Sequence, residues 1–585
     1  MILRQDFLER HKFLILLALF SIQACLLIWN SNRFAPTLDE PAIMTSGLVQ
    51  WGNSDNQDYR TNPPLVRMLA AVPIMASGYT MDWNCATDEY PDRPEFGRGA
   101  VFMTLNRERS LRLLAYSRQA CIPLVLLGGW FACLLAREVC AIRHCELFAM
   151  TLWVFDPMIM SHGALITNDV AATTAILGAS LACIRWMRRP TRLRSLVLGI
   201  SVGLCLVTKF TLLVVPVVIA LFQVIRCYPS SPGRRLVRWL TESLVHVGMM
   251  VVVSVLLVNM VYRIGSVSSL ILNSGKVIPS AVVRIPPWQR TVPARTSLLG
   301  WLPIPKTMLT GIQQQHDECQ RPGVRSYWNG AWRDSGWPGF YLSGLLVKIP
   351  HGTQVLLLLW LIGCRATARN GSVPVVIALS FGLLVLLSAH TTITHHVRYA
   401  LPAWGLLLIF AGAAASSCLH PARSRWMRWL ACIGFVSAIA SPLATLPYNL
   451  GYFNELSGGA WSGYRHLVLS NCDWGQDAGV AADHAVAVNG QGRPVVMEVL
   501  YDTLPVFGFQ SVLSPHQGWS VMPYLKSSPD GIVVVSATGV TLDSALYQDA
   551  IRPPIDRKLF EITQVTPTMF LISNKSMHNA VKALQ

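Results

Sequence analysis

Eleven long apolar segments constrain the fold of this chain more than any other feature. A helix that crosses a bilayer needs about 20 mostly apolar residues, and a backbone in lipid has to satisfy its own hydrogen bonds, which favours helices. Mean hydropathy is +0.41, and 14% of the 585 residues are charged, against roughly 25% in soluble proteins. The sequence therefore predicts an α-helical polytopic membrane protein. The expected spans are Phe13–Trp29, Leu113–Ala136, Phe148–Ile166, Val170–Met187, Leu196–Val207, Leu212–Ile225, Leu244–Val261, Leu342–Gly363, Val373–Ser388, Ala400–Ser417 and Trp429–Leu446.

The first span has the basic start and apolar core of a signal peptide. Only Asn30-Ser31-Asn32-Arg33 follows it, and this stretch is no small-residue cleavage site. We expect an uncleaved anchor. The fifth and sixth spans are short and flank Lys209, so they form either a tight pair or a partly re-entrant segment.

The loop charges predict the orientation. With the N-terminus in the cytoplasm, every short inside loop is basic, as the positive-inside rule requires. This accounts for much of the net charge of +17 without a polyanionic partner, so no nucleic acid is expected. We expect a multi-pass protein of the plasma membrane, the inner membrane of a bacterium. The inside loops hold Arg137 and Arg143; Arg185, Arg188, Arg189, Arg192 and Arg194; Arg226, Arg234, Arg235 and Arg238; Arg365 and Arg369; and Arg423, Arg425 and Arg428.

Three long polar segments then lie outside: 30–110, 263–341 and the tail 448–585. Residues 494–501, 532–536 and 569–573 read as strands and 476–488 as a helix, which predicts a small α/β domain at 448–585 beside a transmembrane domain at 1–447. Three cysteines lie in long polar stretches, which leaves room for at most one disulfide. They are Cys85, Cys319 and Cys472.

Charged residues near the first outer loop are the first candidates for chemistry. Asp39 and Glu40 are adjacent carboxylates suited to general-base work on a hydroxyl, or alternatively a helix N-cap. Arg67 follows Asn62-Pro63-Pro64 in the first turn of an expected helix, where an anion is favoured. The alternative is an arginine that extends to the lipid headgroups.

Further candidates lie at the outer ends of later spans. Asp169 opens the fourth span, and Lys209 lies between the fifth and sixth, where an interface anchor is the alternative. His390, His395 and His396 share one loop with Arg398; they suit a phosphate, and a divalent metal is the less favoured reading. No P-loop, dinucleotide fingerprint or Ser-His-Asp signature is present. If chemistry at the outer face used a sugar donor, that donor would be lipid-linked, because nucleotide sugars are cytoplasmic.

These segments, in their order and sidedness, resemble GT-C fold glycosyltransferases, in particular bacterial members of the branch that holds protein O-mannosyltransferases and the aminoarabinose transferase of lipid A. The resemblance covers most of the chain. The segments that carry it are Leu38-Asp39-Glu40, Asn62-Pro63-Pro64-Leu65-Val66-Arg67, Asp156-Pro157 to Thr167-Asn168-Asp169, Leu206-Val207-Thr208-Lys209-Phe210-Thr211, Tyr327-Trp328-Asn329-Gly330 with Gly336-Trp337 and Lys348-Ile349-Pro350, His396-Val397-Arg398-Tyr399, and Tyr452-Phe453-Asn454-Glu455 with Ser470 to Asp477.

The resemblance implies inverting transfer from a polyprenyl-phosphate sugar to a hydroxyl of a protein, lipid or polysaccharide. It implies Asp39 as the base, with Glu40 and Asp169 orienting the acceptor or tuning Asp39. Arg67, Lys209, Arg398 and His396 would bind the donor phosphate. Asn62 stands where the mannosyltransferases have His, and Arg67 where they have Lys, so a role carried by that His does not transfer.

Three other functions compete with this reading. A transporter or flippase of lipid-linked sugars would place its charges in mid-span, often at broken helices, whereas these cluster at the outer ends. A scaffold with an inert membrane part would tolerate neutral residues at Asp39 and Asp169. A glycan polymerase or ligase would use the same chemistry on a longer donor.

Overall fold

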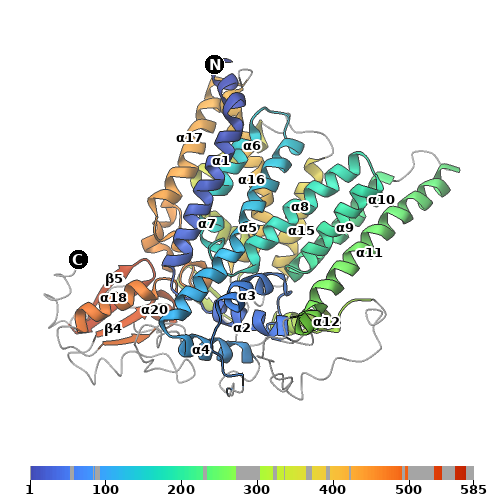
Figure 1. The fold of residues 1–585 in the computed structure, drawn as a ribbon. Helices are drawn as coiled ribbons and strands as arrows, with labels where there is room; N and C mark the ends of the chain where they lie inside the picture. The colour runs from blue at the N-terminus through green and yellow to red at the C-terminus, as the bar shows by residue number, and fades with distance from the viewer. Residues whose placement is uncertain are drawn as a thin grey trace.

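Helices that run between two ends of the molecule make up most of this computed structural model (Figure 1). The structure describes residues 2–52, 58–83, 85, 93–227, 234–271, 303–319, 326–334, 336–363, 372–389, 396–420, 423–489, 495–498, 532–542 and 560–574. The α-helices are α1 Ile2–Arg33, α2 Asp39–Gly52, α3 Leu65–Ser77, α4 Pro94–Asn106, α5 Glu108–Val139, α6 Cys145–Phe155, α7 Pro157–His162, α8 Asn168–Arg188, α9 Arg192–Leu206, α10 Val214–Cys227, α11 Arg234–Ile271, α12 Lys306–Cys319, α13 Phe340–Lys348, α14 His351–Ile362, α15 Val373–Ala389, α16 Leu401–Ser416, α17 Arg425–Ala444, α18 Ala478–Asn489 and α20 Ala537–Leu542.

Six described helices are long and apolar enough to cross a membrane, and a seventh span is reached if the bent pair α13 and α14 counts as one. α8 and α16 are mostly buried inside the helical body, whereas α1, α11 and α17 lie largely on its outside. Large apolar side chains face outward on those outer helices, for example Phe13, Leu256 and Ile433, which are 74%, 63% and 60% exposed. So large an exposed apolar surface is typical of a membrane-facing protein.

Each apolar segment expected to span falls largely on helical residues, but two of them are sharply broken or bent. The segment Phe148–Ile166 breaks at Asp156, because Pro157 cannot continue the backbone hydrogen-bond ladder. Asp156 caps α7 instead, its carboxylate accepting from the backbone N–H groups of Met158 and Ile159. The segment Leu342–Gly363 bends by 115° between α13 and α14, at Ile349-Pro350, where a proline again disfavours a helix.

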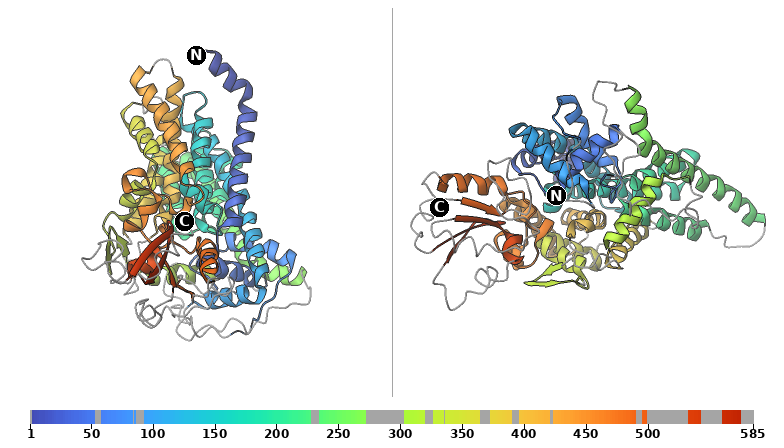
Figure 2. Two further views of the ribbon diagram at one scale, coloured as in Figure 1. Left: turned by 90° about the vertical axis from the view of Figure 1, so that its left-hand side faces the viewer. Right: turned by 90° about the horizontal axis from the view of Figure 1, so that it is seen from below.

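The basic loops gather at one end, which we call the basic end. Arg188 pairs with Glu138 and its guanidinium donates to the Ser372 hydroxyl, so three inter-helix connections meet there. The chain begins at this end, and α1 crosses to the opposite end, where α2, α3, α4 and α12 lie (Figures 1 and 2). We call the opposite end the pocket end.

The C-terminal strands form a four-stranded sheet at the pocket end, in the order β3-β4-β6-β5 (Figure 1). β3 Val495–Glu498 runs parallel to β4 Ile532–Ser536, and β6 Met569–Asn574 is antiparallel to β4 and to β5 Phe560–Thr566. Strands were expected at the positions of β3, β4 and β6. β5 was missed, although Phe560-Glu561-Ile562-Thr563 alternates apolar and polar residues as a strand does.

The segment that leads into the sheet packs against the helical body. Its 3-10 turns are Asn449–Gly451, Glu455–Ser457, Ala460–Arg465 and Leu469–Asn471. The N–H of Ala35 donates to the Gln476 carbonyl at 2.9 Å, and the Lys348 ammonium donates to the Asn471 carbonyl at 2.6 Å. A second, two-stranded sheet pairs β1 Ser326–Trp328 with β2 Ala331–Arg333, and Asn329 between them bonds to His466. The tail and the second outer segment are therefore joined by hydrogen bonds.

Candidate active site

A cavity of about 390 Å³ opens at the pocket end, where the first and second long outer segments both contribute to its wall. The first outer segment contributes Asp39, Ile43, Tyr59, Thr61, Asn62, Arg93 and Phe96, and the second contributes Ile312, Gln315, His316, Glu318 and Tyr341. The start of α8, the turn at Lys209 and the 3-10 turn η7 Val397–Ala400 complete it. Five of the seven candidate residues line this cavity: Asp39, Asp169, Lys209, His396 and Arg398.

Asp39 begins α2 and faces the cavity with 16% of its side chain exposed. Its Oδ2 lies 3.2 Å from the Arg398 Nη2. The local sequence Thr37-Leu38-Asp39-Glu40 explains this placement, because the Glu40 carboxylate reaches back to the backbone N–H of Thr37, as in one half of a capping box. The cap uses Glu40, which leaves the Asp39 carboxylate for the cavity.

Glu40 is buried away from the cavity, so its expected role beside the acceptor is not supported by its position. Its Oε2 accepts from the backbone N–H and the hydroxyl of Thr37, at 3.0 and 2.9 Å. Both carboxylate oxygens accept from Arg118, at 2.8 and 2.6 Å. Burial by itself raises the pKa of Glu40, but Arg118 and the backbone N–H of Ile166 and Thr37 outweigh it and hold the pKa below its usual value. Glu40 is a structural ion-pair partner.

Arg67 is likewise absent from the cavity wall. It is 5% exposed, and its Nη1 donates to the carbonyls of Tyr59 and Asn62 at 2.9 and 2.8 Å. Its Nη2 donates to the Gln50 side chain at 3.0 Å. The arginine therefore holds the loop 59–62 in shape, and its position does not support the expected phosphate-binding role.

Asp169, Lys209 and Arg398 form one buried charge cluster. Lys209 pairs with Asp169 Oδ1, and Arg398 Nη1 lies 3.2 Å from Asp169 Oδ2. An arginine has five N–H groups and a lysine three. In the described part of the chain Arg398 donates three, to Asp39, Asp169 and Ser470, and Lys209 donates one. Donors therefore remain on both cations for an anionic ligand in the cavity.

His396 and Arg398 are both held from the tail. The Ser470 hydroxyl lies 2.6 Å from His396 Nδ1 and 3.1 Å from Arg398 Nε. The indole ring of Trp474 lies 4.0 Å from the Arg398 guanidinium carbon, a cation–π contact. His390 and His395 lie outside the described residues. No group of three or more His, Cys, Asp or Glu side chains that could hold a metal ion is found among the residues that the structure describes.

Several residues of the site were missed by reading the sequence. Tyr59 lines the cavity with a positive φ of 50°, and burial raises the pKa of its phenol well above the usual range. Arg93 Nη1 donates to Glu318 Oε1 at 3.1 Å, which ties the first outer segment to α12. Tyr399 lies with its ring 4.4 Å from the Lys209 ammonium. Of these residues, only Tyr399 lies in a segment that the sequence had singled out, the run His396-Val397-Arg398-Tyr399.

The three cysteines of the polar segments give little support to a disulfide. Cys85 and Cys472 are free thiols, and Cys472 is fully buried. The side chain of Cys319 lies outside the described residues.

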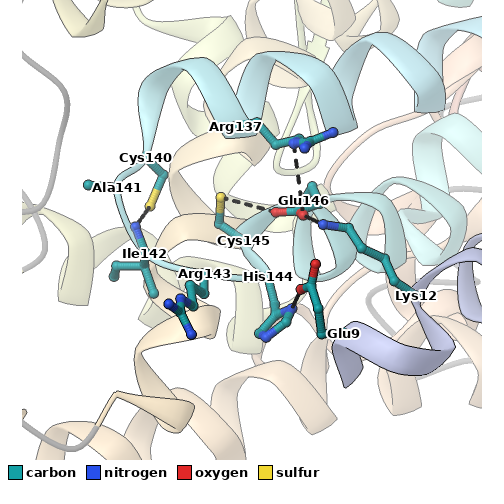
Figure 3. Close-up of a pocket in the computed structure, with 10 residues that line it drawn as sticks. All are labelled: Glu9, Lys12, Arg137, Cys140, Ala141, Ile142, Arg143, His144, Cys145 and Glu146. Atoms are coloured by element: carbon teal, nitrogen blue, oxygen red, sulfur yellow. Dashed lines mark hydrogen bonds and ion pairs between the residues drawn. The ribbon is translucent and has the colours of Figure 1, made fainter. Parts of the chain in front are cut away.

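Another cavity, of about 470 Å³, lies at the basic end between α1 and the α5–α6 connection (Figure 3). Glu146 is paired with Lys12, and Glu9 lies 3.6 Å from His144. Figure 3 shows Cys140 and Cys145 among its lining residues. Because the expected outer residues line the cavity at the opposite end, this cavity is not the candidate active site.

No protein-family model matches the chain, and no curated protein matches it. Among solved structures it is similar to ArnT from Cupriavidus metallidurans bound to undecaprenyl phosphate, at 12% identity and a TM-score of 0.43 over 95% of this chain and 97% of that one. The apo state of the same ArnT matches at 13% identity and a TM-score of 0.42, with the same coverage.

An archaeal oligosaccharyltransferase, AglB from Archaeoglobus fulgidus in complex with an inhibitory peptide and a dolichol-phosphate, matches at 10% identity and a TM-score of 0.42. That match covers 97% of this chain and 75% of that one. Likenesses this loose assign no individual residue, so the roles of the side chains are inferred from their own geometry.

Proposed function

We propose that this chain is a membrane glycosyltransferase that moves a sugar from a polyprenyl-phosphate carrier to an acceptor hydroxyl at the outer face of the membrane. One observation carries the proposal. A carboxylate, Asp39, shares a cavity with two cations, Lys209 and Arg398, that keep unused donors. Base and anion-binding groups are the two things that this transfer requires.

The two sides of the cavity suit the two parts of the donor. Leu213, Leu386 and Leu387 line it near the ends of apolar helices, where a polyprenyl chain can reach from the bilayer. Arg93 and Glu318 line the side formed by the outer segments, where polar groups can meet hydroxyls of the sugar or acceptor.

The reaction follows from this arrangement. Asp39 takes the proton of the acceptor hydroxyl, whose oxygen forms a bond to the anomeric carbon on the face opposite the phosphate. The bond between that carbon and the phosphate oxygen breaks, and its electron pair leaves with the polyprenyl phosphate, which inverts the anomeric centre. Lys209 and Arg398 neutralise the leaving phosphate, and positioned donors of this kind are worth roughly 3–4 kcal/mol each.

Asp169 holds the two cations rather than acting as the base. It is 2% exposed and lies between Lys209 and Arg398, so its charge is neutralised by two cations and it is the weaker candidate for taking a proton. The proposal also includes the topology: eleven membrane crossings, a cytoplasmic N-terminus and a tail at the outer face. They are supported by the basic loops at one end and the cavity at the other.

A transporter of lipid-linked sugars is the rival function. Intramembrane charges of transporters lie near the midplane, whereas the cluster here lies at the N-terminal ends of α2, α8 and α16. This position favours chemistry at the membrane surface.

The test begins with the host that makes this protein. Deleting the chain should cause a polyprenyl-phosphate sugar to accumulate, which mass spectrometry of membrane lipids identifies. Purified protein in nanodiscs should then release polyprenyl phosphate from that lipid when extracts containing the acceptor are added. Lys209→Ala and Arg398→Ala should slow release, and Arg185→Ala, an arginine at the basic end that pairs with Glu138, should not. Movement of the intact lipid across sealed vesicles without release would overturn the transferase in favour of the transporter.

A further inference from the structure

We propose that the tail segment Ser470–Trp474 is a positioning element of the active site, and that Ser470 holds His396 in one tautomer and Arg398 in one plane. The catalytic role of this element rests on the proposed function. The contacts themselves join parts of the chain that are 72 and 74 residues apart, at 3.1 Å for Arg398 and 2.6 Å for His396.

The direction of the Ser470 hydrogen bonds follows from counting protons. Arg398 Nε only donates, so the Ser470 oxygen accepts from it. Ser470 is 1% exposed, and in the described part of the chain its hydroxyl has one further neighbour, His396 Nδ1. If Nδ1 carried a proton and donated, the serine proton would be buried without an acceptor, which is costly. Ser470 therefore donates to Nδ1, and the ring proton of His396 is on Nε2.

Arg398 is restrained on its face and on its edges. The Trp474 ring covers one face at 4.0 Å, and Trp474 is itself 2% exposed. Ser470, Asp39 and Asp169 take one N–H each along the edges. A guanidinium recognises phosphate through a planar fork, so fixing its plane aims the remaining N–H groups at one place in the cavity.

The positioning segment is fastened on both sides. Asn471 Oδ1 accepts from the backbone N–H of Val397 at 2.6 Å, and the Lys348 ammonium donates to the Asn471 carbonyl. On the other side, Asp473 Oδ2 accepts from the backbone N–H of Thr538 at 2.9 Å, just after β4. In the described part of the tail, this short segment reaches the site, and both the helical body and the sheet determine its geometry.

The variants that test this are Ser470→Ala, which removes the hydroxyl, and Ser470→Thr, which keeps it. Ser462→Ala is the matched control, a tail serine whose side chain makes none of these contacts. With the donor lipid identified as above, Ser470→Ala should lower kcat roughly 10- to 100-fold, the range expected for one lost hydrogen bond to a charged group. Ser470→Thr should recover most of it, and Ser462→Ala should match the unmutated protein.

A spectroscopic readout separates positioning from mere stability and needs no activity. In protein labelled with ¹⁵N-histidine, the His396 signals, assigned by their loss in His396→Gln, should report a proton on Nε2 and none on Nδ1. Ser470→Ala should mix the two tautomers, and Ser470→Thr should not. An unchanged tautomer in Ser470→Ala overturns the proposal, whatever the activity. Absence of sugar transfer by the unmutated protein refutes the proposed function. The positioning role of Ser470 is then decided by the tautomer result.

Discussion

Asp39 and Glu40 are neighbours in the chain and differ completely in environment. Asp39 is partly exposed to the cavity beside Arg398, whereas Glu40 is 0% exposed and paired with Arg118. The difference comes from Thr37 and Arg118, whose hydrogen bonds hold the second carboxylate inside the protein. Substituting the two residues should therefore have different consequences, one for rate and the other for stability.

Asp39→Asn should nearly abolish sugar transfer while leaving the protein folded. The amide keeps the size and hydrogen bonds of the carboxylate but does not accept the acceptor proton, and loss of a general base costs on the order of 10²–10⁴ in rate. Initial rates with a defined polyprenyl-phosphate donor, together with the melting temperature, check this. Transfer at the unmutated rate would remove Asp39 as the base.

Glu40→Gln should instead destabilise the fold. It leaves the buried Arg118 guanidinium without its charged partner, and breaking a buried pair costs about 3–5 kcal/mol. Thermal unfolding in detergent measures the loss, with Glu455→Gln as the control, because the Glu455 side chain is 61% exposed. A melting temperature equal to that of the control would contradict the structural role given to Glu40.

Asp477 predicts a pH dependence in the tail. Burial raises its pKa to about 6; its Oδ2 accepts from Thr568 at 2.7 Å, and its Oδ1 has no hydrogen-bond partner in the described structure. An unfolded Asp titrates near 3.9, so between that pH and about 6 the folded state binds more protons than the unfolded state. Stability should therefore fall as pH rises through this window and then level off.

The change attributable to Asp477 is at most about 3 kcal/mol, from two pKa units at 1.36 kcal/mol each. Unfolding midpoints of the full protein between pH 4 and 7, compared with Asp477→Asn, isolate it. In the variant, stability should lack this decrease between pH 4 and 6. Identical pH profiles of stability for the two proteins would show that Asp477 is not the group responsible.

At the level of the secondary-structure elements, α2 holds Asp39 in place because two glycines let its neighbours approach. A Cβ on Gly47 would lie 2.1 Å from the Arg67 carbonyl oxygen in α3, and one on Gly99 of α4 would lie 2.7 Å from the Pro41 carbonyl carbon. Real Cβ atoms do not approach backbone atoms so closely, so either substitution has to move α2.

Gly99→Ala should therefore lower transfer and melting temperature together, by displacing the start of α2 and with it Asp39. Overpacking of this kind costs typically 1–3 kcal/mol. Gly248→Ala in α11 is the matched control, because its Cβ would meet nothing within 4 Å. Equal melting temperatures and rates for the two variants would mean that α4 accommodates the methyl group and that α2 is not so constrained.

For the whole molecule, the charge distribution separates two ends. The connections rich in arginine meet at the basic end, and the cavity and the C-terminal sheet lie at the pocket end (Figures 1 and 2). The positive-inside rule then predicts which end faces the cytoplasm.

Protease added to intact spheroplasts should cleave within the tail 448–585 and leave the N-terminus protected. In inverted vesicles the tail should be protected instead. Immunoblots with tags at each end distinguish the two cases. If the tail is cleaved in inverted vesicles and not in spheroplasts, the topology is the reverse of the predicted one and the cavity faces the cytoplasm. A lipid-linked donor would then no longer be expected, because that expectation rests on an outer-face site.

Local patterns in the sequence were enough to predict the apolar helices and five of the residues that line the candidate cavity. Apolar runs locate the spans, because a span depends on its own twenty residues. Asp39, Asp169, Lys209, His396 and Arg398 were all expected near one membrane surface, since loop charges assign their side. Pro157 and Pro350, where the structure breaks or bends two spans, were also visible in the sequence, but the length of the apolar runs outweighed them.

What the sequence left undecided depends on contacts between distant residues. Arg398 meets Asp39 across 359 positions and Asp169 across 229, and no local pattern pairs them. The same holds for Arg118, which meets Glu40 across 78 positions and makes it structural, and for Ser470, which reaches Arg398 from the tail. Hydropathy and charge assign a residue to a membrane depth and a side, whereas its partner at that depth is chosen only when the helices pack.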